Sequence, residues 1–372
     1  MNSITTKNKL FALESLRGIA AVLVALFHYP SSSFLYFDKG FYAVNFFFIL
    51  SGFVISYNYE DKIKNFKDII NFQIKRFFRL YPVHLFVLLI ILAIQTLKFF
   101  VIEFSTLPFG TEAFGERYNL EDFISNLFLL HSIFNFNYWL SWNPASWSIS
   151  TEFYTYFVFI IIFLVFQRFK FLIIFLLILI ASPFFVENYS YFALPHKFPY
   201  INGVFFQCLF NFGNGCVCYF LFSKLKNQFN DLFVSIFFIF CTSIYFFSSE
   251  LFLKYNFIIF SLIVLVFSKL NSESWTFKIF NIKPLVFLGT ISYSLYMIHE
   301  QIIYILVQIL RFVFKVEFIL DGSTAVHTTS AVYDTMITIL YLFLSVIVSY
   351  LMYKFIEKKF RQDKKLLFSK NI

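Results

Sequence analysis

Long apolar stretches alternate with short polar clusters along nearly the whole chain. A helix that crosses a membrane needs about 20 consecutive, mostly apolar residues. Cutting the sequence at its polar clusters gives ten segments of this kind, which are approximately 11–29, 41–59, 80–100, 146–166, 170–187, 201–222, 231–248, 251–268, 285–314 and 333–356. We therefore predict an all-α, polytopic membrane protein with about ten transmembrane helices.

The basic residues test this arrangement, because cytoplasmic loops of membrane proteins are enriched in Lys and Arg. If the N-terminus is cytoplasmic, 22 of the 30 Lys and Arg residues fall on the cytoplasmic side and seven on the outer side. The asymmetry predicts that both termini are cytoplasmic. It also accounts for the net charge of +9 without nucleic acid, and we expect no nucleic-acid partner.

Composition excludes a soluble globular protein, since 59% of the residues are hydrophobic and only 14% are charged. We expect membrane lipid to surround a single membrane-embedded domain, 1–372, with no appended soluble domain. Its longest polar stretch, about 101–145, is predicted to lie outside. A lid over an outer cavity and a loosely ordered loop both fit this stretch.

The first apolar segment carries an ionisable side chain near each end. Arg17 and His28 are separated by ten residues that are all apolar or Gly, so a helix sets the two side chains about 16 Å apart. Ionisable groups inside membrane segments are costly and usually line a polar interior. Two simpler readings stay open, with Arg17 as an interfacial anchor and His28 at the level of the headgroups beside Pro30.

A second pair of cations precedes the third segment, in the sequence QIKRFFRLYP. Arg76 and Arg79 are three residues apart, so on a helix they lie on one face and can converge on one anion. A guanidinium holds phosphate through two parallel hydrogen bonds, which Lys cannot do. The alternative is that both arginines mark the cytoplasmic side and bind lipid headgroups.

Polar side chains interrupt the second segment. If Asn45 is buried, its amide needs hydrogen-bond partners, and a bond between helices to Arg17 or His28 is one possibility. Ser51 and Gly52 are small residues of the kind that let membrane helices approach closely, so we interpret both first as packing residues.

The fourth segment holds a carboxylate roughly two turns from its start. Glu152 must there be protonated, paired or next to water. A carboxylate inside the bundle can orient an imidazole such as that of His28, and the structural alternative is that Glu152 pairs with an internal arginine. Trp142 and Trp147, at the start of the segment, are typical of an interfacial aromatic belt.

The ninth segment places five polar side chains inside one helix, namely Ser292, Tyr293, Ser294, Tyr296 and His299. His299 fits either a functional site or a core histidine with its hydrogen bonds satisfied. Cys216 and Cys218 have the wrong spacing for a redox or zinc motif. We predict no metal site.

Five motifs of this chain resemble those of the acyltransferase 3 family, integral membrane enzymes that acylate carbohydrates of the cell envelope. They are Arg17 to His28 (Arg, ten residues, His), Asn45 to Phe53 (FFxLSGF), Arg76 to Arg79 (RxxR), Trp147 to Tyr154 (WSLxxExxFY) and Leu288 to His299 (GxxSYxLYLxH). Family members often carry Asp at the position of Asn45, and their EKPF motif reads EKKF at Glu357–Phe360 here.

The resemblance implies an O-acyltransferase of the inner (cytoplasmic) membrane that takes acetyl, or another short acyl group, from acyl-CoA as co-substrate, with no bound cofactor. Its acceptor is a carbohydrate or lipid-linked glycan, with O-antigen, capsule, exopolysaccharide, peptidoglycan and a glycosylated metabolite all open. The implied catalytic residues are His28 and Glu152, and Arg76, Arg79 and Arg17 are expected to bind acyl-CoA. The expected supporting residues are Asn45, Ser51, Tyr154, Ser292, Tyr293 and His299.

The main alternative is a proton-coupled transporter or flippase of glycolipid or polysaccharide, since buried Arg, His and Glu also suit a proton path. Such transporters usually contain inverted repeats and paired broken helices. We identify neither in this sequence.

Overall fold

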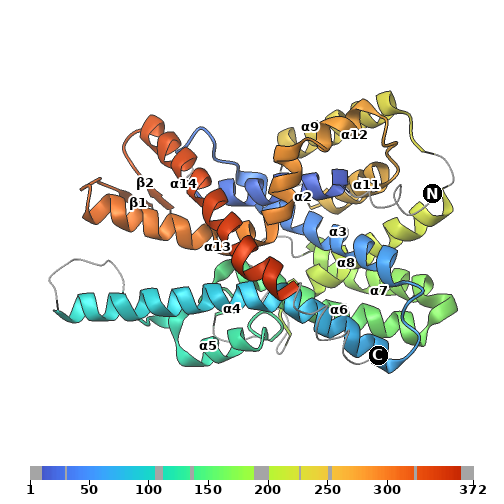
Figure 1. Cartoon of the computed structure of the whole chain (residues 1–372), viewed down its shortest axis with the longest axis horizontal. Helices are drawn as coiled ribbons and strands as arrows, with labels where there is room; N and C mark the ends of the chain where they lie inside the picture. Colours follow the sequence, from blue (N-terminus) through green and yellow to red (C-terminus); the bar gives the residue numbers. More distant parts are fainter. Residues whose placement is uncertain are drawn as a thin grey trace.

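A computed structural model describes residues 11–29, 32–104, 112–134, 138–187, 201–225, 228–249, 254–321 and 325–361. Both chain ends lie outside these ranges. The prediction that both termini are cytoplasmic therefore concerns residues outside the described part of the chain. The elements, shown in Figure 1, are α2 (Phe11–Phe27), η1 (Asp38–Tyr42), α3 (Ala43–Tyr59), α4 (Phe66–Phe104), η2 (Glu116–Tyr118), α5 (Leu120–Leu127), η3 (Pro144–Ser146), α6 (Trp147–Val165), η4 (Gln167–Phe169), α7 (Lys170–Glu187), α8 (Gly203–Lys224), α9 (Asp231–Phe247), α11 (Asn256–Ser268), α12 (Trp275–Phe280), α13 (Lys283–Phe312), β1 (Ile319–Asp321), β2 (Ala325–His327), α14 (Ala331–Met352) and η5 (Tyr353–Glu357).

The fold is helical, as predicted, apart from a small antiparallel hairpin of β1 and β2 between α13 and α14. Six helical stretches of the described chain are long and apolar enough to cross a membrane, and they are Asp38–Tyr59, Phe66–Phe104, Pro144–Val165, Gly203–Lys224, Lys283–Phe312 and Ala331–Arg361. The other four predicted spans coincide with α2, α7, α9 and α11, which are only 13 to 18 residues long. The count of ten crossings therefore stays a prediction.

The third predicted span, 80–100, lies within a much longer helix. Helix α4 runs for 39 residues, from Phe66 to Phe104, about 58 Å at the rise of an α-helix and well beyond the ~30 Å of a bilayer core. It appears in Figure 1 as the long helix along the lower edge. Arg76 and Arg79 consequently lie on this helix, close to the internal Pro82, where their spacing sets them on one face.

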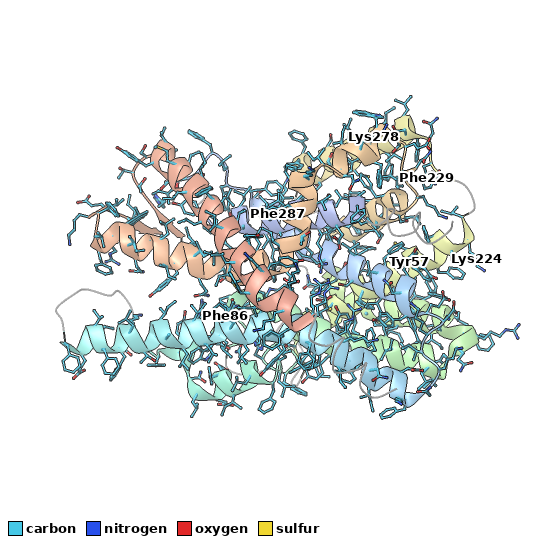
Figure 2. The ribbon with its side chains drawn as sticks, viewed as in Figure 1. Tyr57, Phe86, Lys224, Phe229, Lys278 and Phe287 are labelled. Carbon is cyan, nitrogen blue, oxygen red and sulfur yellow. The ribbon has the colours of Figure 1, made fainter. Side chains whose placement is uncertain are left out.

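Large apolar side chains cover the outside of the bundle. In α4 only 28% of the most apolar stretch is buried. Phe86 on α4 and Phe287 on α13 are 40% and 38% exposed, and both are marked in the side-chain view of Figure 2. Exposed apolar side chains are unfavourable in water, so these faces suit contact with lipid.

Helices α2 and α13 make the closest crossing near the functional residues. A Cβ atom on Gly18 would lie 2.5 Å from the backbone nitrogen of Gly289, and one on Gly289 would lie 2.2 Å from the carbonyl oxygen of Glu14. Ala21 and Ala25 continue the small, buried face of α2. Only small residues allow membrane helices to approach so closely, and here they fix the two backbones in contact.

The predicted outer stretch, 101–145, is ordered in its described parts. Asn119 caps α5 by accepting a hydrogen bond of 2.7 Å from the backbone N–H of Asp122, an arrangement typical of helix starts. Trp142 is 3% exposed and packs against Tyr118 and Phe123. Trp147 is also 3% exposed, so the prediction of an interfacial tryptophan belt is wrong and both rings belong to the core.

Gly289→Ala should destabilise the fold by about 1–3 kcal/mol, the usual cost of forcing extra atoms into a packed interior. The control is Gly115→Ala, where the new Cβ would meet only the Glu112 carbonyl oxygen, at 3.7 Å. Thermal unfolding of the detergent-solubilised protein measures both. Equal midpoints for Gly289→Ala and the wild type would show that the crossing is looser than described.

Candidate active site

Three arginines from two helices line one cavity inside the bundle. The cavity has a volume of about 90 Å³, and Arg17 of α2 and Arg76 and Arg79 of α4 all contribute to its wall. A smaller cavity of about 30 Å³ adjoins it, because Arg17, Arg79 and Tyr156 line both. The structure thus brings together the three residues that were expected to bind acyl-CoA.

Aromatic rings hold the most buried of these cations. The guanidinium carbon of Arg76 lies 5.4 Å from the ring centre of Tyr59, 5.2 Å from that of Phe72 and 5.7 Å from that of Tyr156. Arg76 is 8% exposed. Each such cation–π contact contributes on the order of 0.5–2 kcal/mol, which partly offsets the cost of burying the charge.

No carboxylate neutralises the three guanidinium groups by direct contact. Within the described ranges, the close acid–base pairs are His28 with Glu300, which is ionic only when the imidazole is protonated, Lys170 with Glu60, and Arg361 with Glu357. Glu14 lines the larger cavity and Glu152 the smaller one, so the walls carry three cations and two anions. An anion that entered would meet an excess of positive charge in a partly dehydrated site.

Glu152 lines the smaller cavity. We expected it to contact His28, and it does not. Its Oε1 accepts a hydrogen bond of 2.5 Å from the hydroxyl of Tyr156 and another from Ser51. Tyr156 was missed by sequence reasoning, although it follows Glu152 by four residues and so shares its helix face. Tyr154, which was expected to support the site, is two residues from Glu152 and instead donates to the Phe128 carbonyl at 3.0 Å.

Ser148 and Tyr296 connect the smaller cavity to His299 through hydrogen bonds. Ser148 donates a hydrogen bond of 2.8 Å to the hydroxyl of Tyr296, and both residues line the cavity. The backbone carbonyl of Tyr296 lies 2.7 Å from Nδ1 of His299. The far wall of the cavity is therefore part of the same helical turn as His299.

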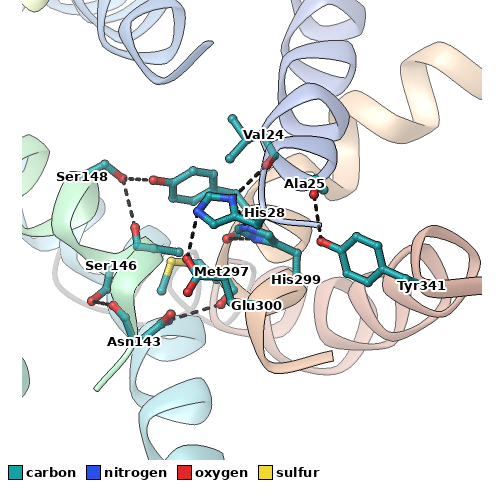
Figure 3. A network of polar contacts seen from close by, with 12 residues as sticks. Val24, Ala25, His28, Asn143, Ser146, Ser148, Met297, His299, Glu300 and Tyr341 are labelled. Atoms are coloured by element: carbon teal, nitrogen blue, oxygen red, sulfur yellow. Dashed lines mark hydrogen bonds and ion pairs between the residues drawn. The ribbon is translucent and has the colours of Figure 1, made fainter. Parts of the chain in front are cut away.

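His28 and His299 meet where α2 ends against α13, as Figure 3 shows. Nε2 of His299 lies 3.2 Å from Nδ1 of His28, and Nδ1 of His28 also lies 2.9 Å from the Val24 carbonyl oxygen. On the other side of the ring, Nε2 of His28 faces Oε1 of Glu300 at 3.5 Å. The carboxylate beside His28 is thus Glu300, whose only sequence signal was its place next to His299.

Hydrogen bonds fix the middle of α13 and the last turn of α2 to their surroundings (Figure 3). Asn143 donates to the Met297 carbonyl at 3.2 Å, and the hydroxyl of Ser146 donates to the Asn143 carbonyl at 2.6 Å. Tyr341 of α14 donates to the Ala25 carbonyl at 3.3 Å. Two neighbouring elements, the η3 turn with its N-cap Asn143 and helix α14, therefore hold the helices that bring the two histidines together.

Asn45 takes no part in either the arginine cavity or the histidine pair. Its side-chain oxygen accepts from Gln207 at 2.9 Å and from Asn211 at 3.1 Å, and its amide nitrogen donates to Asn256 at 3.2 Å. The expected bond to Arg17 or His28 is replaced by these amides of α8 and α11. Asn45 therefore joins three helices.

The remaining predicted residues divide between chemistry and packing. Ser292 and Tyr293 line the smaller cavity, and Tyr293 also donates to the Leu80 carbonyl of α4 at 2.5 Å. Ser51 lines both cavities, so its interpretation as a packing residue was incomplete. Gly52 does pack, because a Cβ there would lie 2.0 Å from the Phe212 carbonyl oxygen.

One group of the described side chains has a composition that could hold a metal ion, whereas we predict no metal site. A ligand atom each of His28, His299 and Glu300 lies within 4.8 Å of the others. Two imidazoles and a carboxylate are also the ligands of some catalytic zinc sites. Their chemistry is equally suited to moving a proton.

The comparisons with known proteins assign the family. The model described as the acyltransferase domain of the acyltransferase 3 family matches residues 10–354 of the 372. No curated protein and no solved structure matches the chain. The matched range contains the arginine cavity and the histidine pair, and the chain belongs to the acyltransferase 3 family of membrane acyltransferases.

Proposed function

We propose that this protein moves an acyl group, acetyl in the first instance, from cytoplasmic acyl-CoA to a hydroxyl group of a cell-envelope carbohydrate, at the inner (cytoplasmic) membrane. The observation that carries the proposal is the pair of adjoining cavities: three arginines line the larger one, and a wall of the smaller one belongs to the helical turn that holds His299. The acceptor is an O-antigen, a capsule or an exopolysaccharide.

The arginine end suits the donor. Acyl-CoA carries phosphates, and guanidinium groups bind phosphate through paired, charge-assisted hydrogen bonds. Arg17 and His28 are eleven residues apart on one helical rod, which corresponds to about 16 Å. The phosphates would stay with the arginines while the pantetheine arm carries the thioester past Tyr296 toward His28.

The position of His28 suits the role of general base in acyl transfer. A hydroxyl that attacks a thioester must lose its proton, and imidazole is the side chain best matched to accept it near neutral pH. The oxygen attacks the carbonyl carbon, His28 takes the proton, the carbon–sulfur bond breaks, and the departing thiolate receives that proton. The products are the acylated sugar and free CoA, and His28 returns to its starting state.

His28→Ala should lower acetyl transfer by about 10²–10⁴-fold, the usual effect of removing a general base. The assay incubates membranes containing the protein with labelled acetyl-CoA and follows acetyl in the envelope glycan by mass spectrometry. His327→Ala is the matched control, because it removes an imidazole from the hairpin strand β2.

Near-normal acetylation by His28→Ala, at equal protein level, would remove His28 from the mechanism. If the wild type moves glycan across the membrane without consuming acetyl-CoA, the protein is a transporter instead.

Arg76→Gln and Arg79→Gln should each raise the KM for acyl-CoA by about 10–100-fold and leave kcat nearly unchanged. The lost bonds, worth about 1.5–3 kcal/mol each, hold phosphates far from the reacting carbonyl, so substrate and transition state lose the same contact. Arg76→Lys should restore only part of the affinity. Arg168→Gln, an exposed position in η4, is the control.

Initial rates at varied acetyl-CoA separate the two constants, and the amount of folded protein is checked by size-exclusion chromatography. A fall in kcat with unchanged KM would place the arginines at the reacting centre instead.

A further inference from the structure

The hydrogen-bond partners of the two histidines assign a proton to each ring. The Tyr296 carbonyl can only accept, so Nδ1 of His299 carries the hydrogen that makes this 2.7 Å contact. The same argument places a hydrogen on Nδ1 of His28, which lies 2.9 Å from the Val24 carbonyl. A neutral imidazole has one N–H, so Nε2 of each ring is an acceptor.

The unprotonated Nε2 atoms of His28 and His299 have different neighbours. Nε2 of His299 accepts the Nδ1–H of His28 at 3.2 Å. Nε2 of His28 instead faces Oε1 of Glu300 at 3.5 Å, beyond the 2.7–3.2 Å of an ordinary N–H···O bond. Oε1 of Glu300 is buried and has no hydrogen-bond partner in the described part of the chain.

Two acceptors therefore face each other at this corner of the site, the buried Oε1 of Glu300 and the more exposed Nε2 of His28, and neither receives a hydrogen bond from the described residues. Buried polar atoms are nearly always hydrogen-bonded, and leaving one without a partner is costly. One hydroxyl carries one proton and satisfies only one of the two acceptors. Two hydroxyls on neighbouring carbons of a sugar supply one donor to each atom.

Exposure agrees with a ligand at this position. The side chains of His28 and Glu300 are 26% and 16% exposed, whereas His299 is 1% exposed. An incoming sugar can reach the first two residues but not the third. We infer that Glu300 and His28 together bind two adjacent hydroxyls of the acceptor, that the hydroxyl on His28 is the one acylated, and that His299 positions His28.

This inference rests on the proposed acyl transfer and assigns separate roles. Glu300 holds the neighbouring hydroxyl and so selects a sugar with a vicinal diol. His28 takes the proton of the reacting hydroxyl at Nε2. His299 is a positioning residue, because it keeps the Nδ1–H of His28 in place and leaves Nε2 free for the substrate.

The test compares two reactions of the same membranes, both supplied with labelled acetyl-CoA. One is transfer of acetyl to the envelope glycan, and the other is slow hydrolysis, in which water replaces the sugar. Water has no second hydroxyl for Glu300 to hold, so Glu300→Leu should lower transfer by about 10–100-fold more than it lowers hydrolysis. Glu300→Gln keeps a carbonyl acceptor and should recover part of the transfer, and Glu317→Gln, an exposed carboxylate after α13, is the control.

His299 should behave differently from Glu300. His299→Leu should lower transfer and hydrolysis by the same factor, because it acts through His28, and His299→Gln, which keeps an acceptor, should restore part of both reactions. Failure of Gln to improve on Leu, at equal amounts of folded protein, would overturn the positioning role.

Four results would overturn the role of Glu300. They are unchanged transfer by Glu300→Leu, an equal loss of transfer and hydrolysis, a product whose acetylated carbon has no neighbouring hydroxyl-bearing carbon, and a stoichiometric metal ion in the purified protein that is lost in Glu300→Leu. If the wild type neither transfers nor hydrolyses acetyl-CoA, the proposed function fails and the inference fails with it.

Discussion

The glycine crossing of α2 and α13 is the contact on which the site depends. Gly18 lies against Gly289, and His28 lies against His299. Both steps are ten residues long, so the two helices run in the same direction and stay in register for about 15 Å. A side chain at either glycine would separate the backbones and withdraw one imidazole from the other.

The same pair of helices carries a cluster of positive charge at one place and the two histidines about three turns away. At one end, Arg17 of α2 meets Arg76 and Arg79 in a cavity where none of them forms an ion pair with a carboxylate of the described residues. Buried charges are costly unless a counter-charge or polar ligand compensates them. The aromatic cage of Arg76 offsets part of this cost, and a bound anion would offset more. At the other end, Glu300 and His28 form a corner short of hydrogen-bond donors, which a sugar supplies. The arginine cavity lacks negative charge, and the corner of Glu300 and His28 lacks hydrogen-bond donors. These two environments are consistent with an anionic acyl donor and an acceptor that is rich in hydroxyls.

The sequence predicted the helices well because long apolar stretches have few alternatives in a membrane, and the motif residues Arg17, Arg76 and Arg79 do meet. The sequence did not predict which residues contact each other where this depends on the rotation of a helix about its axis or on contacts between distant segments. Tyr154 was chosen over Tyr156, although only the latter shares a face with Glu152. Glu152 was assigned to His28, while the neighbouring carboxylate comes from α13 as Glu300. The amide partners of Asn45 lie on α8 and α11, far along the chain. The start of α4 was missed because its charged first turns resemble a loop, whereas charged residues are good helix formers outside the bilayer core.

The central claim is that donor and acceptor meet from opposite sides of the membrane, with the arginines on the cytoplasmic side. The most direct measurement uses sealed vesicles of known orientation that contain the protein and its glycan acceptor on the outer face. Labelled acetyl-CoA is supplied to one face at a time, and acetylation of the glycan is followed. The account predicts acetylation only when acetyl-CoA is present at the cytoplasmic face. Equal acetylation from acetyl-CoA at the outer face would contradict it, and the three arginines would then have no role in bringing the donor across.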